Sequence, residues 1–434
     1  MIKVCFYINN QGIQELDCEK IYEFNPGMGG TPYLFFLLTY YLSKKYKNEL
    51  DITLLTMYKQ RVNENVNNIV IGDEYKAIDY CKDNNIDILV VRTIEDLYFY
   101  KYAKNKEVNI VTWSHNFINN YEVIKELSDN KCVKKNVFVG KEQLEYYIDD
   151  SIYDKSIYIY NLFNSNNYRK NINNVEEKSN NVTYIGSLIE EKGFHILAKN
   201  WTKIKKSVPD AQLYVIGGGN LYNRNNNINN IIPTSDSYTN KILKSLGKAR
   251  EEIGKSIHFM GTLGEQKNDI LKKTKVGISN PSGKTETFGI TAVEFQASGI
   301  PVVTKKCCGY LDTVFHKKTG YLFNSENEMV KFIIELLKNN NLNKELSYNA
   351  IVFANDKFRI DDTCNEWKLM FENVVNGKNG YHENKIKNIN FKRKWLKIHI
   401  RRVRGLFKSN LSYTRTKLFI LCKIKNIIKK GRGK

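Results

Sequence analysis

The stretch "ETFGITAVEFQASGIPVV", residues 286–303, places two glutamates around a turn from loop into helix. An apolar run ends just before it at "NPS", the helical segment opens beside Gly289, and a glycine stops that segment before the next apolar run. Glu286 falls in the loop, and Glu294 lies about two helical turns further on. Because ligands bind at the carboxyl ends of parallel strands, we expect this loop to lie at a binding site.

The same alternation of short β-branched runs with helical segments extends over most of the chain, which indicates βα units and parallel sheets. The runs are, in order, "IKVCFYI", "DITLLTM", "NIVIG", "IDILVVR", "VNIVTW", "KNVFVG", "SIYIY", "VTYIGS", "QLYVIGGG", "SIHFMG", "KVGISNPS", "IPVVTK" and "GYLF". The predicted fold class is therefore α/β, with two tandem Rossmann-like doubly wound domains that face an interdomain cleft.

Two Asn-rich stretches interrupt this pattern. The first, Asn164–Asn181, is polar and aperiodic and predicts a linker between the two series of strands. We accordingly expect a first domain over 1–165, a second over 166–375 and a tail over 376–434. The second stretch, Asn223–Ile231, predicts a solvated loop to which we assign no function.

Cysteine usage and apolar patterning bear on the compartment. The eight cysteines include no CxxC pair, and the opening "MIKVCFYINN" lacks the pattern of a secretory leader, so we expect a reduced, cytoplasmic setting. The most apolar segment, Pro32–Leu42, has about 11 residues against the roughly 20 that a membrane span needs. It predicts a buried helix.

The positive charge is concentrated at one end of the chain. The net charge is +21, and residues 381–434 contain 18 Lys and Arg against the single acid Glu383. The rest of the chain is nearly balanced, which makes the tail the basic part of the molecule.

In the first domain, the candidate site residues are a glycine loop and a histidine. Gly29 and Gly30 precede a helix, whose N-terminal N–H groups suit a phosphate, although a plain glycine turn explains them equally well. The GxGxxG pattern is absent, so a dinucleotide site is not supported. His115 ends a strand, where it either has a structural role or bonds a sugar hydroxyl. The histidines show no spacing typical of zinc sites, and we expect no metal and no cofactor.

In the second domain, each candidate has a plain alternative. Lys192 lies at a turn into a helix and is either a solvated charge or a ligand for a diphosphate. Gly217 follows a strand, where exposed backbone suits a flat nucleoside. Glu286 and Glu294 either bind one ligand at different depths or are ordinary helix-terminal and solvated glutamates.

Taken in order, these motifs resemble the retaining nucleotide-sugar glycosyltransferases of family 4, which have the GT-B fold. The resemblance runs over most of residues 1–375. Its most specific part resembles that family's donor-site signature and consists of Pro281-Ser282, Glu286-Thr287-Phe288-Gly289, Glu294, Ala297, Gly299 and Pro301-Val302-Val303.

The resemblance implies roles by position. Glu286 would hold donor-sugar hydroxyls, Glu294 the ribose diol and Lys192 the diphosphate, while His115 would lie near the transferred sugar; His115, Glu286 and Lys192 form the expected catalytic group. The expected donor-binding residues are Gly29, Gly30, Ser187, Gly217, Phe288, Gly289, Ile290, Thr291 and Glu294.

Two positions depart from the family pattern. Ser187 stands where the family usually has an arginine, so either Lys192 neutralises the leaving diphosphate with less help or another cation such as Lys284 moves in. Asp312 stands where a glutamate is usual. The expected reaction is transfer of a sugar from a nucleotide sugar to an acceptor, with positioned cations and backbone N–H groups stabilising the leaving diphosphate.

The tail predicts an amphipathic helix. In "FKRKWLKIHIRRVRGLFK", residues 391–408, Phe391, Trp395, Ile398 and Leu406 cluster on one side and most basic residues lie opposite. This pattern favours an anionic membrane surface as the partner of residues 391–430, ahead of a disordered solubilising tail, with nucleic acid ranked last.

A peripheral enzyme on the cytoplasmic face of the membrane, acting on a lipid-linked or cell-surface glycan as in bacterial polysaccharide assembly, would unite body and tail. Two alternatives stay open. One is a nucleotide-sugar epimerase of similar architecture, and the other is a non-catalytic basic binding protein with a degenerate donor site.

Overall fold

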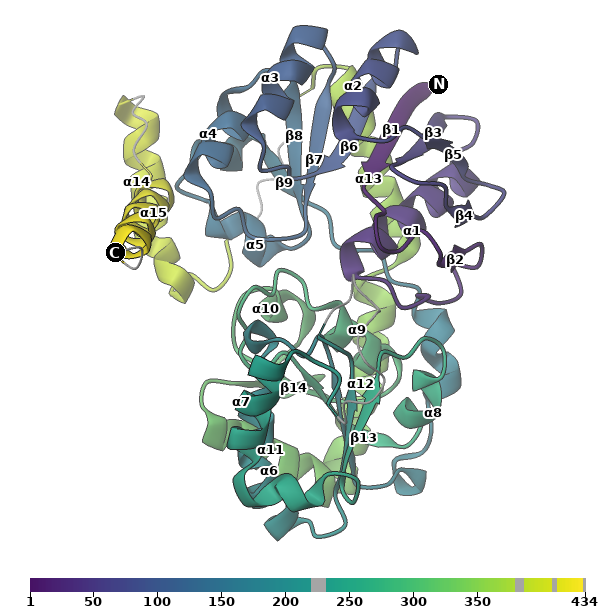
Figure 1. Cartoon of the computed structure of the whole chain (residues 1–434), viewed down its shortest axis with the longest axis vertical. Helices are drawn as coiled ribbons and strands as arrows, with labels where there is room; N and C mark the ends of the chain where they lie inside the picture. The colour runs from purple at the N-terminus through teal and green to yellow at the C-terminus, as the bar shows by residue number, and fades with distance from the viewer. Residues whose placement is uncertain (220–231, 379–385, 408–411, 432–434) are drawn as a thin grey trace.

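The computed structural model describes residues 1–219, 232–378, 386–407 and 412–431 (Figure 1). The stretch Asn223–Ile231, for which the sequence predicts a solvated loop, lies outside the described residues, as do 408–411 within the predicted membrane-binding tail.

The first domain is built on a parallel sheet of seven strands in the order β5-β3-β1-β6-β7-β8-β9. The strands are β1 (Ile2–Ile8), β3 (Leu50–Thr56), β5 (Asn67–Val70), β6 (Ile88–Arg92), β7 (Ile110–Ser114), β8 (Val133–Phe138) and β9 (Ser156–Tyr158). The helices between them are α1 (Gly30–Lys45), α2 (Glu74–Asp83), α3 (Leu97–Lys106), α4 (Tyr121–Asp129), α5 (Lys141–Tyr146) and the 3-10 helix η1 (Ser151–Lys155). A separate pair joins β2 (Asp17–Cys18) to β4 (Arg61–Val62).

The second domain has a parallel sheet of six strands in the order β12-β11-β10-β13-β14-β15. The strands are β10 (Asn181–Ile185), β11 (Gln212–Ile216), β12 (Ile257–Gly261), β13 (Thr274–Ser279), β14 (Val302–Lys305) and β15 (Gly320–Phe323). The helices are η4 (Glu190–Lys192), α6 (Phe194–Ser207), α7 (Asp236–Leu246), η5 (Gly247–Glu252), α8 (Lys267–Leu271), α9 (Ile290–Ala297), α10 (Tyr310–Thr313), α11 (Glu326–Lys338) and α12 (Asn340–Lys357).

Both sheets reverse their strand order in the middle, between β1 and β6 and between β10 and β13. This is the topology of doubly wound folds, in which the crevice at the reversal point binds ligands. The prediction of an α/β fold with parallel sheets is confirmed, and each apolar run quoted above overlaps a strand of these two sheets.

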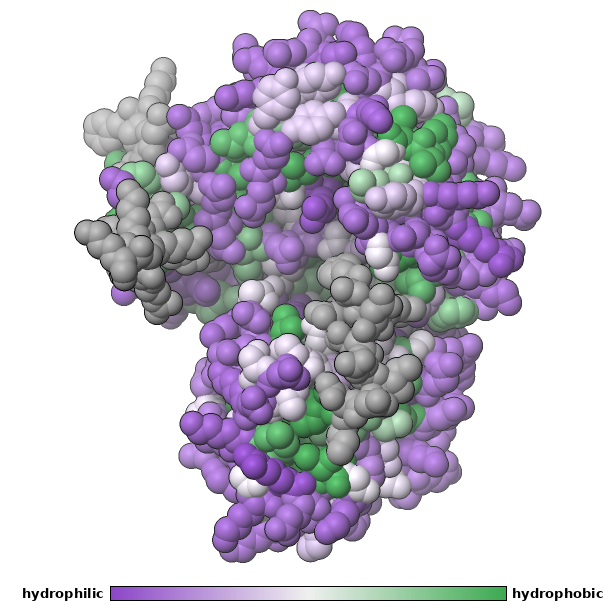
Figure 2. All heavy atoms as spheres, viewed as in Figure 1, coloured by the Kyte–Doolittle hydropathy of each residue, from purple (hydrophilic) through white to green (hydrophobic). Residues whose placement is uncertain are grey.

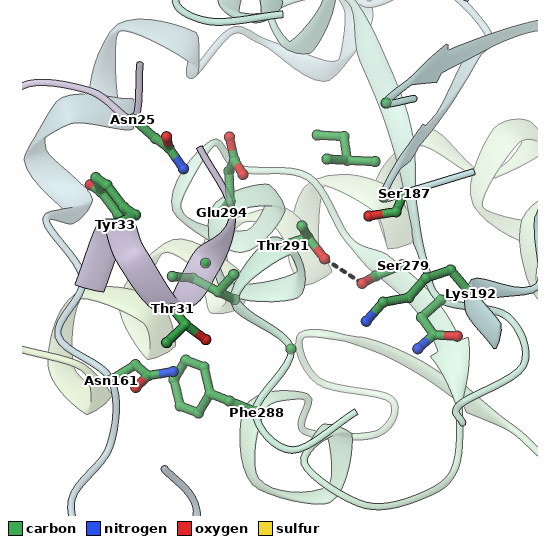
Figure 3. Close-up of a pocket in the computed structure, with 18 of the residues that line it drawn as sticks. Asn25, Thr31, Tyr33, Asn161, Ser187, Lys192, Ser279, Phe288, Thr291 and Glu294 are labelled. Carbon is green, nitrogen blue, oxygen red and sulfur yellow. Dashed lines mark hydrogen bonds between the residues drawn. The ribbon is translucent and has the colours of Figure 1, made fainter. Parts of the chain in front are cut away.

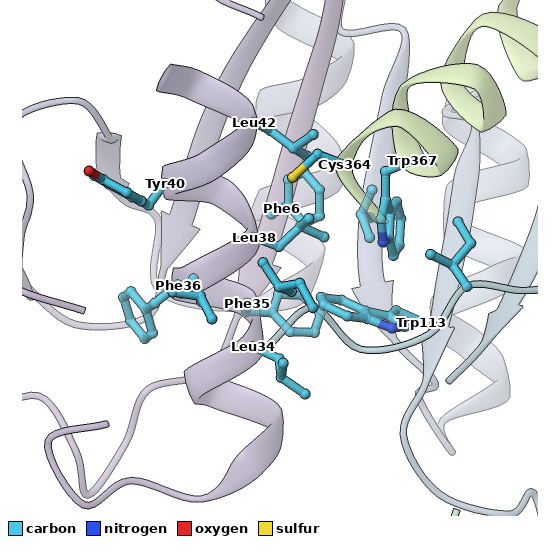
Figure 4. Close-up of a cluster of buried hydrophobic side chains, with 14 of the residues drawn as sticks. Phe6, Leu34, Phe35, Phe36, Leu38, Tyr40, Leu42, Trp113, Cys364 and Trp367 are labelled. Atoms are coloured by element: carbon cyan, nitrogen blue, oxygen red, sulfur yellow. The ribbon is translucent and has the colours of Figure 1, made fainter. Parts of the chain in front are cut away.

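The apolar segment Pro32–Leu42 forms most of helix α1, as predicted, and all its side chains except those of Tyr33 and Tyr41 are buried. Phe35 on this helix packs edge-on against Phe6 of β1 and lies 5.0 Å, centroid to centroid, from Trp113 of β7 (Figure 4). Aromatic rings at such distances add to the stabilisation that burial itself provides. This cluster is the centre of the first domain's core.

Helix α13 (Ile360–Val375) completes that cluster from the far end of the chain. Its Trp367 lies 4.9 Å from the Trp113 ring and 6.0 Å from Phe6 (Figure 4). The predicted second domain, 166–375, therefore ends in a helix that packs against the first domain. The reason is the apolar face of α13, which fills the groove beside α1 and β1.

The Asn-rich stretch between the domains is well packed. It forms the 3-10 helices η2 (Ser165–Asn171) and η3 (Val175–Glu177), and Asn171 is fully buried between Asn268 and Ser298. The side chain of Lys178 donates to the carbonyl of Gly299 at 2.8 Å. Buried amides with partners explain why a polar sequence is ordered here.

The tail consists of η6 (Phe391–Arg393) and the helices α14 (Lys394–Phe407) and α15 (Tyr413–Gly431), which lie beside the first domain (Figure 1). Basic side chains of both helices face five acids on α5, η1 and the segment between them. The ion pairs are Lys394 with Glu142 and Glu145, Lys397 with Asp149, Arg401 and Arg404 with Asp154, and Arg415 with Asp150. Charge complementarity thus docks the tail by its basic side.

Within the described residues, none of the helices combines the length and the apolarity that crossing a bilayer requires. On the face that Figure 2 displays, hydrophilic residues cover most of both domains and hydrophobic ones gather in small patches.

We predict that Lys394→Met releases the tail from the first domain. Lys394 is 1% exposed and lies 2.8 Å from Glu142 and 2.5 Å from Glu145, so its loss leaves the buried Glu142 without its cation and Glu145 with only Lys141 at 3.9 Å. Breaking such a cluster costs about 3–5 kcal/mol. Hydrogen exchange should show lost protection in α14 and the start of α15, whereas Lys423→Met, at an exposed lysine, should leave it unchanged. Full protection in Lys394→Met would contradict the ionic docking.

Candidate functional site

A cavity of about 380 Å³ lies between the two domains, at the carboxyl ends of strands next to both reversal points (Figure 3). The first domain lines it with the loop before α1 and the residues after β7. The second domain lines it with the turns after β10 and β11, the end of β13 and the start of α9. The cavity is therefore placed where doubly wound domains bind ligands.

All twelve residues that the sequence predicts for the site line this one cavity. They are Gly29, Gly30, His115, Ser187, Lys192, Gly217, Glu286, Phe288, Gly289, Ile290, Thr291 and Glu294. The residues come from five separate segments of the chain, 29–30, 115, 187–192, 217 and 286–294, which the two sheets bring together.

Glu286 is held as an anion at one end of the cavity. Lys192 Nζ donates to its Oε2 at 2.9 Å, and Asn280 and the hydroxyl of Tyr310 donate to the same oxygen at 3.2 and 3.3 Å. Burial alone would raise the pKa of Glu286, but Lys192 and these hydrogen bonds outweigh it and hold the pKa below its usual value. The lysine and the glutamate predicted for two different ligand groups are thus paired with each other.

A second ion pair joins the buried Glu294 on α9 to Lys267, the first residue of α8. Oε1 is the carboxylate oxygen that lies against Lys267 Nζ, and the Tyr168 hydroxyl lies beside the same carboxylate, so a ligand hydroxyl would share it with these two groups. The ring of Tyr168 lies beside this pair, with Lys267 Nζ 5.8 Å from its centroid.

Two glycines are required by close approach of the chain. Gly289 caps α9 with φ 87°, and a Cβ there would lie 2.5 Å from the Tyr310 ring. Gly217 has φ 140°, and a Cβ would lie 2.0 Å from the carbonyl oxygen of Gly186. Neither position tolerates a side chain, so the backbone itself forms the cavity wall at both.

His115 is kept neutral by burial, which lowers its pKa to about 3. Its ring lies 4.4 Å from that of Trp113, and its Nε2 has no hydrogen-bond partner among the described residues. The carbonyl of His115 accepts a hydrogen bond from Thr287 Oγ1, which ties it to the second domain. A neutral imidazole with a free nitrogen suits hydrogen bonding to a hydroxyl better than it suits carrying charge.

A second cavity, of about 780 Å³, opens on the other side of His115 within the first domain. It lies at the carboxyl ends of β1, β6 and β7, and both acidic and basic side chains line it, among them Glu74, Arg92 and Glu95. His115, Asn116 and Thr31 belong to both cavities. The two spaces therefore meet at the histidine.

Sequence reasoning missed Lys267 and Tyr168. Lys267 sits in the polar run "GEQKND", and Tyr168 lies in the stretch interpreted as a linker, so neither carried a local signal. Lys284, the cation proposed to stand in for the missing arginine, is exposed and does not line the cavity. The second lysine that lines the cavity, besides Lys192, is Lys267. The described residues contain no cluster of three or more His, Cys, Asp or Glu suited to a metal ion.

Residues 166–353 match the family model described as glycosyl transferases group 1. This part of the chain, most of the second domain, is therefore similar to that family. Among curated proteins, an uncharacterised glycosyltransferase of Haemophilus influenzae is 28% identical over 188 residues, which are 42% of this chain and 46% of the relative. One from Methanocaldococcus jannaschii is 26% identical over 271 residues, 62% of this chain and 61% of that protein. The matches thus span about half the length of these relatives.

Solved glycosyltransferases share the fold of both domains. A crystal structure of Anabaena HepE in complex with UDP and glucose aligns with a TM-score of 0.62 at 13% identity, covering 86% of this chain and all of that one. A glycosyltransferase from Rickettsia africae aligns with a TM-score of 0.65 at 16% identity, covering 86% and 98%. Both domains of the chain therefore have the fold of these structures.

Asp312 of α10, in the second domain, contacts the first domain and makes the stability of the protein depend on pH. Its Oδ2 accepts from the backbone N–H of Glu142 at 2.8 Å. Burial, and then Glu142 and Glu145 nearby, raise its pKa to about 7, although that N–H and Lys357 oppose the shift. Because the folded-state pKa exceeds the unfolded one, the stability from the protonated form is lost as pH rises through 7.

We predict that Asp312→Asn, which keeps an acceptor oxygen, gains stability over the wild type between pH 6 and pH 8 by on the order of 1 kcal/mol. Urea unfolding at the two pH values measures the change. Asp269→Asn, at a side chain 85% exposed, serves as control and should show no such difference. Parallel pH curves for wild type and Asp312→Asn would contradict the assignment.

Proposed function

We propose that this chain is a retaining glycosyltransferase of family 4, which moves a sugar from a nucleoside diphosphate sugar to a glycan or lipid-linked acceptor. The observation that carries the proposal is the pair of Lys–Glu contacts, Lys192 with Glu286 and Lys267 with Glu294, in one cavity between the domains. Such a cavity offers both cations for a diphosphate and carboxylates for hydroxyl groups.

The ion pairs suggest how the donor would bind. A diphosphate that reaches Lys192 draws its ammonium from Glu286, and the released carboxylate oxygen becomes free to accept hydrogen bonds from sugar hydroxyls. Glu286 keeps two other donors, Asn280 and Tyr310, so it stays oriented after the exchange. At the other pair, a ribose diol would share the Glu294 carboxylate with Lys267, which contacts its Oε1.

The leaving diphosphate gains negative charge as the anomeric C–O bond breaks, so fixed positive groups lower the barrier. Lys192 and the N-terminal turn of α9, which begins after Gly289, are aimed into the same cavity. Ser187 supplies no charge in place of the arginine usual in the family, and Lys267 is the additional cation of this lining. Neither glutamate is required as a nucleophile in this scheme.

His115 stands where the acceptor would meet the donor. The cavity in the first domain, with Glu74, Arg92 and Glu95, offers charged hydrogen-bonding groups to a glycan, and His115 forms its boundary with the donor cavity. With a pKa near 3, His115 is a neutral hydrogen-bonding group at physiological pH and not an acid.

Glu294→Gln tests the donor site. The variant should lose about 1.5 kcal/mol or more of affinity for the nucleoside diphosphate that wild type prefers, because a charged acceptor becomes a neutral one. Calorimetric titration with a panel of nucleoside diphosphates and nucleotide sugars measures the loss. Glu265→Gln, at an exposed side chain that pairs with Lys170, is the matched control and should bind like wild type.

The same panel separates the alternatives. Conversion of a nucleotide sugar in the absence of any acceptor would replace the transferase proposal with an epimerase. Binding without any turnover would replace it with a non-catalytic binding protein.

We further propose that the enzyme works as a peripheral protein on the cytoplasmic face of the membrane, through the tail. On the outer side of α14, Trp395 is 48% and Leu406 79% exposed. Because the basic side is docked on the first domain, the apolar side is the one offered outward, as in helices that lie in a membrane interface.

Trp395→Ser with Leu406→Ser should weaken binding to phospholipid vesicles at least about tenfold, since each side chain loses the free energy of burial in the interface. Vesicle co-sedimentation measures this. The matched control is Tyr348→Ser with Val352→Ser, an exposed apolar pair on α12. Unchanged membrane fractionation of a chain that lacks residues 386–434 would rule out this role of the tail.

A further inference from the structure

The basic residues of the described tail fall into two groups. Five of them, Lys394, Lys397, Arg401, Arg404 and Arg415, are paired with acids of the first domain and hold the tail in place. Others form no ion pair with any residue that the structure describes. Of this second group, Lys392, Arg393 and Lys417 converge on a single cavity.

That cavity has a volume of about 230 Å³ and lies between η6, the start of α14, the start of α15 and α5. Besides the three unpaired cations, it is lined by Lys397, Thr414 and the rings of Tyr146 and Tyr413. A hydrogen bond to Thr414 Oγ1 at 2.6 Å and the contact with Asp149 at 3.4 Å fix Lys397. Its Nζ lies 4.2 Å from the centre of the Tyr146 ring, and that of Lys392 lies 5.4 Å from it.

The acids nearby leave this cavity with a strong excess of positive charge. Asp149 already bonds Ser412, Thr414 and Lys397, and none of the residues lining the cavity is acidic. Four cations around a space lined with hydroxyl groups match an oxyanion with several acceptor oxygens, such as a phosphate group.

The surroundings of the cavity indicate which kind of molecule would carry this phosphate group. Lys417 shares one face of α15 with Ile420, Leu421 and Ile424, at spacings of three, four and seven residues, and these three side chains are 51%, 43% and 47% exposed. A headgroup phosphate held at Lys417 would therefore place its acyl chains along an exposed apolar stripe.

We propose that this cavity, lined by Lys392, Arg393, Lys397 and Lys417, is a binding site for the phosphate of an anionic phospholipid. The proposal rests on the membrane role of the tail and makes it specific. Docking of the tail orders the site, because α14 and α15 contribute from one side and Tyr146 of α5 from the other. The tail then binds lipid through a defined pocket in addition to its apolar stripe.

The test compares two double variants. The cavity pair combines Lys392→Gln and Lys417→Gln. The control pair combines Arg402→Gln and Lys423→Gln and removes the same charge from exposed tail positions outside the cavity. Full-length proteins are mixed with vesicles of phosphatidylcholine alone or with added phosphatidylglycerol. Each lysine or arginine near an anionic surface contributes up to roughly fivefold, so the control pair should lose at most roughly 25-fold in binding to the anionic vesicles. The cavity pair also loses its direct contacts with the phosphate and should lose clearly more.

A second measurement removes the bilayer. Calorimetric titration with soluble dihexanoyl phosphatidylglycerol should show binding to wild type and to the control pair, and loss of it in the cavity pair. Equal losses in both pairs, or no loss in either, would overturn the cavity while leaving the membrane role intact. Tight binding of inorganic phosphate with no response to the lipid would overturn the assignment to a lipid. Absence of binding to any vesicle would reject the membrane role and this site together.

Discussion

The structure depends on the contact that α13 makes when the chain returns to the first domain. Trp367 closes an aromatic cluster with Phe6, Phe35 and Trp113, and because α13 follows the second domain, this contact ties the two domains together a second time. The cluster also reaches the cleft, since Trp113 packs on His115. Core packing in one domain thus positions a side chain at the junction of the two cavities.

Charges in the donor cavity and along the docked side of the tail are balanced locally. Lys192 and Lys267 are paired with glutamates inside the donor cavity. Five acids between 142 and 154 form ion pairs with the basic side of the tail. Buried charges persist only when they are paired in this way. The cations that remain unpaired are therefore informative, because the fold of the described residues does not require them.

Much of the fold and of the cavity lining could be predicted, because periodicity and glycine-rich turns are local signals. Gly289 is an example, since its place before α9 follows from the sequence pattern alone. Lys267 could not be found in this way, because its partner Glu294 is 27 positions away and nothing near it in sequence marks the contact. The docking of the tail had a visible signal, the acidic run "KEQLEYYIDDSIYD" at 141–154, but opposite charges predict a contact only once the topology has placed both surfaces.

Helix α5 shows how closely the separate parts are connected. The backbone N–H of Glu142 bonds Asp312 of the second domain, while its carboxylate bonds Lys394 of the tail. A single buried residue of the first domain is therefore in contact with both of the other parts of the molecule. A buried carboxylate and a buried N–H each need a hydrogen-bonding partner. Loss of either contact would therefore leave one of these groups of Glu142 without that partner, which costs free energy. The tail is thus joined to the domain interface through one residue, although Lys394 and Glu142 lie 252 positions apart in the sequence.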